Sequence, residues 1–144
     1  MATEGGAILA DSVATIYSSY DIFEYNTAIQ NGGVFIIMTR SVFYLNNVKF
    51  RYNYAKRDSG ITAYKTSYLE RFLISNCEFY SNYAISNTFS FFDTIGDIDS
   101  TVFVNNYGRT SSENIFISFS SLNITNSKFK MSSYTNQSSI AITK

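Results

Sequence analysis

Apolar and polar residues alternate in short runs along most of the chain, which is the pattern of β-strands. Phe43-x-Leu45 followed by Val48-x-Phe50 recurs as Phe72-x-Ile74 followed by Cys77-x-Phe79. A period of two residues indicates a strand with one buried face, and an Asn separates the two runs of each pair. No segment combines a 3.6-residue period with capping residues, so we expect essentially no long helix.

A phenylalanine followed three residues later by asparagine recurs along the chain. The four copies are Phe23 with Asn26, Phe50 with Asn53, Phe79 with Asn82, and Phe103 with Asn106. Phe129, followed by Ser132, ends the series as an altered fifth copy, and the successive phenylalanines are 27, 29, 24 and 26 residues apart. A motif at a nearly fixed period indicates stacked repeats, each sharing its core with its neighbours.

Glycine marks the start of the early repeats. Gly6, Gly33 and Gly60 are 27 residues apart, and Asn87 and Asn114 begin the corresponding segments of later repeats. We interpret each repeat as three short strands: one after the glycine, one at the Phe-x-Leu pair and one at the phenylalanine of Phe-x-x-Asn. Asn and Gly are expected at the turns between them.

This organisation predicts an all-β fold, a parallel β-helix (solenoid) of about five coils of 24–29 residues with three short strands per coil. The phenylalanines are expected to stack as an internal column, and the asparagines as a ladder of amides. A β-sandwich also has short strands and turns, but it does not predict a fixed motif at a fixed period.

The predicted domain covers residues 1–144, and neither end carries a polar capping segment. Uncapped strand edges recruit other strands. We therefore expect either a segment of a longer solenoid or a subunit whose ends associate with one another. Identical open ends that do not close into a ring give filaments.

The composition narrows the functional classes. The 144 residues include 11 basic and 11 acidic side chains, so no excess of positive charge is present for nucleic acid or anionic lipid. The absence of histidine excludes Ser-His-Asp and Cys-His catalysis and histidine-ligated metals, and we expect no cofactor and no metal. Val34–Met38, the longest aliphatic run, is far shorter than the roughly 20 residues of a membrane span. Cys77, the single cysteine, is expected to be a small buried apolar residue.

Gly5-Gly6-Ala7-Ile8, taken with the Phe-x-x-Asn copies, resembles the repeats of the polymorphic outer membrane protein family. The similarity extends over nearly the whole chain and is strongest in residues 5–84, whereas the second half lacks the tetrapeptide. The resemblance implies a right-handed parallel β-helix of the pectin-lyase type. It also implies a surface-exposed or secreted protein used for adhesion or structure, with no catalytic residues.

Three groups of residues are candidate sites. Asp93, Asp97 and Asp99 form an acidic cluster of the kind that in some β-helix proteins acts as acid, base or calcium ligand, although we favour a solvated turn with Gly96 at the corner. Asn123 and Asn136 begin Asn-x-Ser/Thr sequences and are candidate N-glycosylation sites. An aromatic surface for sugar or protein contact is the third candidate, formed by Tyr17, Tyr20, Tyr52, Tyr54, Tyr80, Tyr83 and Tyr107.

The charges at Lys56, Arg57, Asp58 and Lys65 are expected to form a solvated loop. Our functional prediction is a non-enzymatic structural or adhesive β-helix, extracellular or on the cell surface, and a filament building block. Its expected partners are other solenoid ends, surface glycans or other surface proteins. The alternative is a carbohydrate-active module that uses the three aspartates, or a carbohydrate-binding module that uses its tyrosines.

Overall fold

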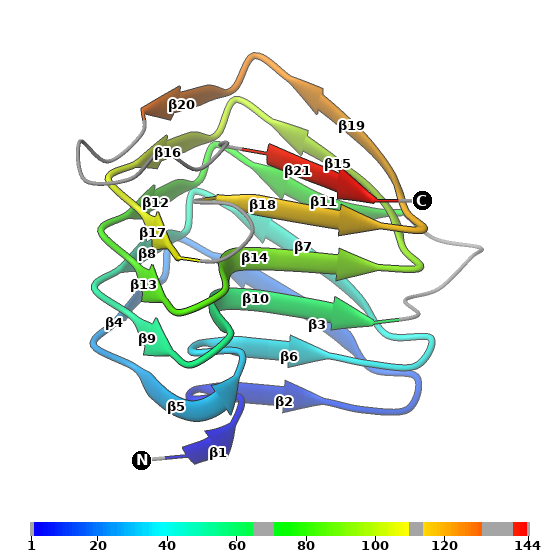
Figure 1. Ribbon diagram of the computed structural model, residues 1–144. Coiled ribbons are helices and arrows are strands. Elements are labelled where there is room, and N and C mark those ends of the chain that lie inside the picture. The colour runs from blue at the N-terminus through cyan, green and yellow to red at the C-terminus, as the bar shows by residue number, and fades with distance from the viewer. Residues whose placement is uncertain (1, 65–70, 110–113, 131–139, 144) are drawn as a thin grey trace.

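The computed structural model describes residues 2–64, 71–109, 114–130 and 140–143. All regular structure in these residues is β-strand, and the chain winds upward from its N-terminus at the bottom of Figure 1. Every strand pairing in these four segments is parallel. The predicted all-β parallel solenoid of about five coils is confirmed.

The strands form four sheets, which we call sheets A to D. In stacking order sheet A contains β1 (Ala2–Glu4), β5 (Thr27–Asn31), β9 (Tyr54–Ala55), β13 (Tyr83–Ala84) and β17 (Tyr107–Gly108). Sheet B contains β2 (Ile8–Ala10), β6 (Phe35–Ile37), β10 (Asp58–Tyr64), β14 (Asn87–Phe92), β18 (Ile115–Ser118) and β21 (Ile140–Thr143). Sheet C contains β3 (Thr15–Ser19), β7 (Val42–Asn46), β11 (Phe72–Ser75), β15 (Ile95–Asp99) and β19 (Ser121–Thr125). Sheet D contains β4 (Ile22–Glu24), β8 (Lys49–Arg51), β12 (Glu78–Tyr80), β16 (Val102–Val104) and β20 (Lys128–Lys130).

A described coil therefore has four strands, and the prediction of three is wrong. The missed strand is the one in sheet A, which follows the Asn of Phe-x-x-Asn. It is only two residues long in β9, β13 and β17. Two residues are too few to show an alternating pattern in the sequence.

The corners between sheets depend on single residues in the left-handed region of φ. Between sheets C and D these residues are Tyr20, Asn47, Asn76, Ser100 and Asn126, with φ between 48° and 62°. Between sheets D and A they are Tyr25, Tyr52, Ser81 and Asn105. Such a residue turns the chain sharply, and asparagine adopts this conformation at lower cost than most residues.

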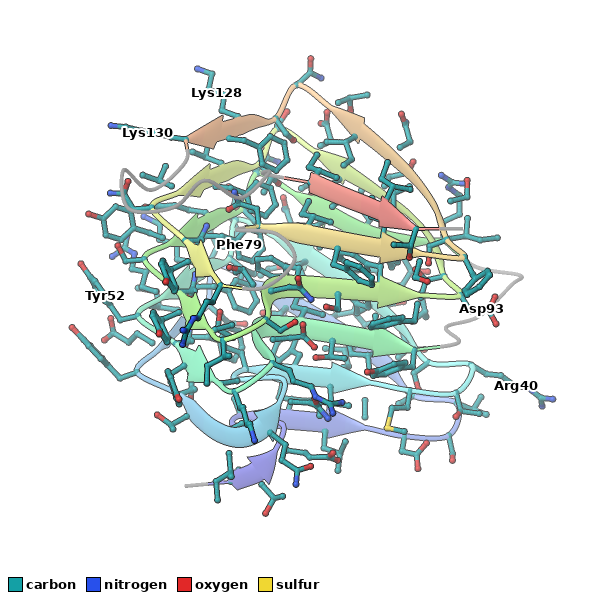
Figure 2. All side chains as sticks on the ribbon, viewed as in Figure 1. Arg40, Tyr52, Phe79, Asp93, Lys128 and Lys130 are labelled. Atoms are coloured by element: carbon teal, nitrogen blue, oxygen red, sulfur yellow. The ribbon has the colours of Figure 1, made fainter. Side chains whose placement is uncertain are left out.

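The core is a set of stacked side-chain columns, one layer per coil. Phe23, Phe50, Phe79, Phe103 and Phe129 stack with successive ring centroids 5.4, 4.7, 4.9 and 4.6 Å apart. Phe89 packs edge-on against this column, 4.4 Å from Phe79. Figure 2 shows Phe79 inside the coil, while Tyr52 and Lys130 point outward. Parallel in-register pairing places equivalent positions of successive coils directly above one another. A motif that recurs in each coil therefore produces a continuous core.

Cys77 also lies in this core, 2% exposed, and burial raises the pKa of its thiol to about 11. The thiol is therefore protonated near neutral pH and is not a reactive nucleophile there. In the four described segments of the chain, no helix has the length and hydrophobicity needed to cross a membrane.

Candidate functional site

The asparagines of the Phe-x-x-Asn motif form a hydrogen-bonded ladder along the D–A corner. The backbone N and the Nδ2 of Asn53 both donate to Oδ1 of Asn82, at 3.1 and 2.9 Å. Asn26 makes the same two bonds to Asn53, at 3.0 Å each. The second Nδ2 hydrogen of Asn82 goes to the carbonyl of Phe50 at 3.0 Å. Each central amide therefore uses both donors and both lone pairs of its oxygen.

Asn106 ends the described part of the ladder. Its Oδ1 accepts from the backbone N and the Nδ2 of Asn82. Its own Nδ2 donates to the carbonyl of Phe79 and to Oδ1 of Asn114, at 3.0 and 2.9 Å. Ser132, at the fifth copy, lies outside the described residues.

The repeated glycines are required by close approach of neighbouring coils. A Cβ on Gly6 would lie 2.1 Å from the carbonyl oxygen of Gly33, and one on Gly33 would lie 2.3 Å from that of Ser59. At Gly60 the obstacle is the ring of Phe89, 2.5 Å away. Gly6 itself does not have a left-handed φ. The residue before it, Gly5, does, with a φ of 55°.

Two further corners carry ladders of hydroxyl groups, which the sequence did not predict. At the C–D corner the backbone N of Cys77 donates to Oγ1 of Thr101, and the backbone N of Thr101 donates to Oγ of Ser127. At the B–C corner the backbone N of Thr94 donates to Oγ of Ser120 at 3.0 Å. Ser and Thr share these positions with residues such as Ala14 and Cys77, so they give no constant sequence signal.

The three predicted acidic residues do not converge on one site. Asp93 lies at the corner between β14 and β15, on the right of Figure 2, with a φ of 54°. Asp97 and Asp99 lie farther along β15 and point outward from sheet C. Among the residues that the structure describes, no group of three or more His, Cys, Asp or Glu is arranged to hold a metal ion.

The two aspartates of β15 are engaged in separate contacts. Asp97 accepts two hydrogen bonds from the guanidinium of Arg71, at 2.7 and 2.9 Å, and these lower the pKa of its carboxyl. Asp99 accepts from Oγ1 of Thr125 at 2.6 Å and from Nδ2 of Asn126 at 2.8 Å. These bonds lower the pKa of Asp99 as well, so both groups are ionised and unsuited to act as a general acid near neutral pH.

Asn123 is exposed on β19, where an attached glycan would meet solvent. Asn136 lies outside the described residues.

The seven tyrosines lie on different parts of the solenoid and form no single flat surface. Tyr17 stacks on Tyr44 over sheet C, at 5.0 Å. Along sheet A, Tyr83 stacks between Tyr54 and Tyr107, at 5.6 and 4.8 Å. Tyr20, 78% exposed, occupies the C–D corner, and Tyr52 with Tyr80 lies at or next to the D–A corner. Tyr83 is stacked on both of its faces, whereas Tyr17, Tyr54 and Tyr107 are each stacked on one face.

Asp58 is the main departure from the sequence prediction, because it is 3% exposed instead of lying in a solvated loop. Its carboxylate accepts hydrogen bonds from the hydroxyls of Thr62, at 2.8 Å, and Ser90. Asn87 donates to Ser90 at 3.0 Å and completes a buried polar cluster at the outer face of sheet B. Burial raises the pKa of Asp58 to about 6, against the opposing effect of these hydrogen bonds. Lys65, predicted in the same loop, lies outside the described residues.

Comparisons of the chain with known protein families, with curated proteins and with solved structures give no match. The fold assignment rests on the four parallel sheets and on the side-chain columns that run through them.

Proposed function

We propose that the chain is a non-enzymatic β-solenoid module, a stiff structural or adhesive segment of an extracellular or cell-surface protein. We also propose that it is a divergent relative of the polymorphic outer membrane protein repeats. The motifs that support this relationship are Gly5-Gly6-Ala7-Ile8 and the Phe-x-x-Asn copies.

The observation that carries the structural role is the asparagine ladder, which joins successive coils from Asn26 to Asn106 through side-chain amides. Backbone pairing alone leaves corner N–H groups without strand partners, and the ladder satisfies them coil after coil. The asparagine ladder and the phenylalanine column both run parallel to the long axis, so hydrogen bonds and ring stacks connect each coil to the next. A rod built in this way resists bending and suits a spacer or adhesin.

The edges of the solenoid offer sites for further β-strands. In the lowest coil Ile8, Ile16 and Phe23 are only partly buried, and in the highest described coil so are Leu122 and Phe129. These residues belong to the same inward-facing columns as the fully buried core. We expect further coils or another solenoid copy to cover them, with parallel strand pairing as the mode of contact.

The non-enzymatic part of the proposal draws support from Asp97 and Asp99, whose oxygens are held by Arg71 and by Thr125 and Asn126. Glycoside cleavage requires a pair of carboxyl groups across a bond, one of them protonated. The lowered pKa values of both aspartates act against the second requirement.

Electron microscopy of the native material that contains this chain tests the proposal. We expect rods with an axial repeat of about 4.8 Å. As a test of location, we expect antibodies against the chain to label intact, unpermeabilised cells. Labelling only after permeabilisation would contradict the surface location, and globular particles would contradict the structural role. Polysaccharide cleavage that disappears in Asp97→Asn would contradict the non-enzymatic assignment.

A further inference from the structure

We propose that a hollow on the outer side of sheet B, next to Tyr64, binds one neutral pyranose unit of a glycan. The hollow has a volume of about 340 Å³, within the range of small-ligand pockets. Its lining residues are Glu4, Asn31, Ile36, Met38, Thr39 and Tyr64. It lies away from the acidic cluster of sheet C.

Tyr64 provides an aromatic face at the end of a stack. Its ring is stacked on Phe92, with centroids 4.7 Å apart and planes 7° apart, and Phe92 contacts Phe116 in the next coil at 5.5 Å. The stack does not continue downward, because Ala63 pairs with Ile37 and the residue below Tyr64 is thus Met38. The ring face opposite Phe92 is turned toward the hollow, and a pyranose placed there would extend the stack.

The other lining residues supply what a sugar ring requires. Ile36 and Met38 form an apolar floor against which an edge of the stacked sugar ring would lie. Glu4 and Asn31 form a polar rim in which Nδ2 of Asn31 donates to Oε1 of Glu4 at 3.2 Å. A carboxylate beside an amide matches two neighbouring sugar hydroxyls: one hydroxyl donates to the carboxylate of Glu4, and the other accepts from Nδ2 of Asn31.

The described lining of the hollow favours a neutral sugar. Among the described residues that line it, Glu4 is the single charged one, so an anionic sugar would meet the repulsion of its carboxylate. A single carboxylate also fits binding rather than cleavage, which needs two. The inference rests on the proposed adhesive role, to which it adds the chemical class of the ligand.

Saturation-transfer NMR tests the site with methyl glycosides of glucose, galactose, mannose and N-acetylglucosamine, each at millimolar concentration. We expect transfer to the C–H protons of at least one probe. Tyr64→Ala should weaken that binding about tenfold, because the aromatic face is lost, while Tyr64→Phe should retain it. Tyr83→Ala is the matched control, since this tyrosine stacks on sheet A, is 42% exposed and should leave binding unchanged.

Glu4→Gln provides a second variant, since Glu4 is exposed and its replacement should preserve folding. Loss of part of the affinity in this variant would support the rim assigned here. No transfer to any of the four probes, or equal binding by the wild type and Tyr64→Ala, would overturn the site. Rods in electron micrographs without glycoside binding would overturn this inference alone, whereas binding by globular particles would overturn the structural role alone.

Discussion

Asn82 donates two hydrogen bonds to the side-chain oxygen of Asn106, one from its backbone N at 3.0 Å and one from its Nδ2 at 2.9 Å. The oxygen of Asn82 accepts the equivalent pair from Asn53 in the coil below. A primary amide donates and accepts at once, and the short Asn side chain holds it at the corner. Aspartate cannot donate these bonds when ionised, and leucine cannot form them at all.

Replacing Asn82 by alanine should lower the free energy of unfolding by about 3 kcal/mol. The substitution leaves the backbone N of Asn53 and the carbonyl of Phe50 without their side-chain partner, in a region where Asn82 itself is 0% exposed. Urea unfolding measures the change. Asn123→Ala, on the exposed face of β19, is the control and should change stability by less than about 0.5 kcal/mol. Equal losses in the two variants would show that the ladder adds nothing specific.

Tyr20 should be replaceable by asparagine with a gain of about 1 kcal/mol in stability. It has a φ of 62° and is 78% exposed, whereas Asn47 and Asn76 occupy the same corner in the next two coils. A bulky residue with a left-handed φ is strained, and asparagine is less so. Thermal unfolding provides the measurement. Tyr17→Asn in β3 removes a ring that is stacked on Tyr44 of β7, and it should lower stability instead. A melting temperature for Tyr20→Asn at or below that of the wild type would refute the strain argument.

Asn123 should receive an N-linked glycan when the chain is expressed through a eukaryotic secretory pathway. The residue is exposed on β19, and its sequon ends at Thr125. Mass spectrometry of the secreted protein should show one glycan that is lost in Asn123→Gln. Asn136→Gln is the companion variant and distinguishes the two sequons. Secreted protein whose peptide spanning Asn123 carries no glycan would contradict this expectation.

The sequence predicted those features that repeat with one residue type. Phe79 and Asn82 recur as the same amino acids at a nearly constant spacing, so the parallel stacking could be inferred from them. The hydroxyl ladders escaped prediction because Thr101 follows Cys77 at the same position, and only the side-chain oxygen matters there. Each corner with a hydroxyl ladder therefore shows a mixture of residues.

Asp58 escaped prediction for a different reason. Its neighbours Lys56 and Arg57 make the local sequence look like a solvated loop, although Asp58 begins β10. The partners that hold its carboxylate are Thr62, four residues later, and Ser90, in the next coil. Only the pairing of β10 with β14 brings Ser90 close, and no local pattern reveals that contact.

Asp58 should make the protein more stable at acidic than at neutral pH, in comparison with Asp58→Asn. Burial raises the pKa of Asp58 from 3.8 to about 6, so the folded protein binds this proton more tightly than the unfolded chain. The stabilisation is fully present below pH 3.8 and is lost as the pH rises to about 6. A shift of about two pKa units corresponds to about 3 kcal/mol.

Urea unfolding of both proteins between pH 4 and pH 8 measures this effect. The free energy of unfolding of the wild type minus that of Asp58→Asn should fall by about 2 kcal/mol from pH 4 to pH 6 and become constant above about pH 7. Asp97 and Asp99 act in the opposite direction. Because their pKa values are lowered in the folded protein, they stabilise the fold at pH values above their pKa in the unfolded chain. They are present in both proteins and cancel in the difference. A difference that is independent of pH would mean that Asp58 is solvated, as its sequence neighbours suggest.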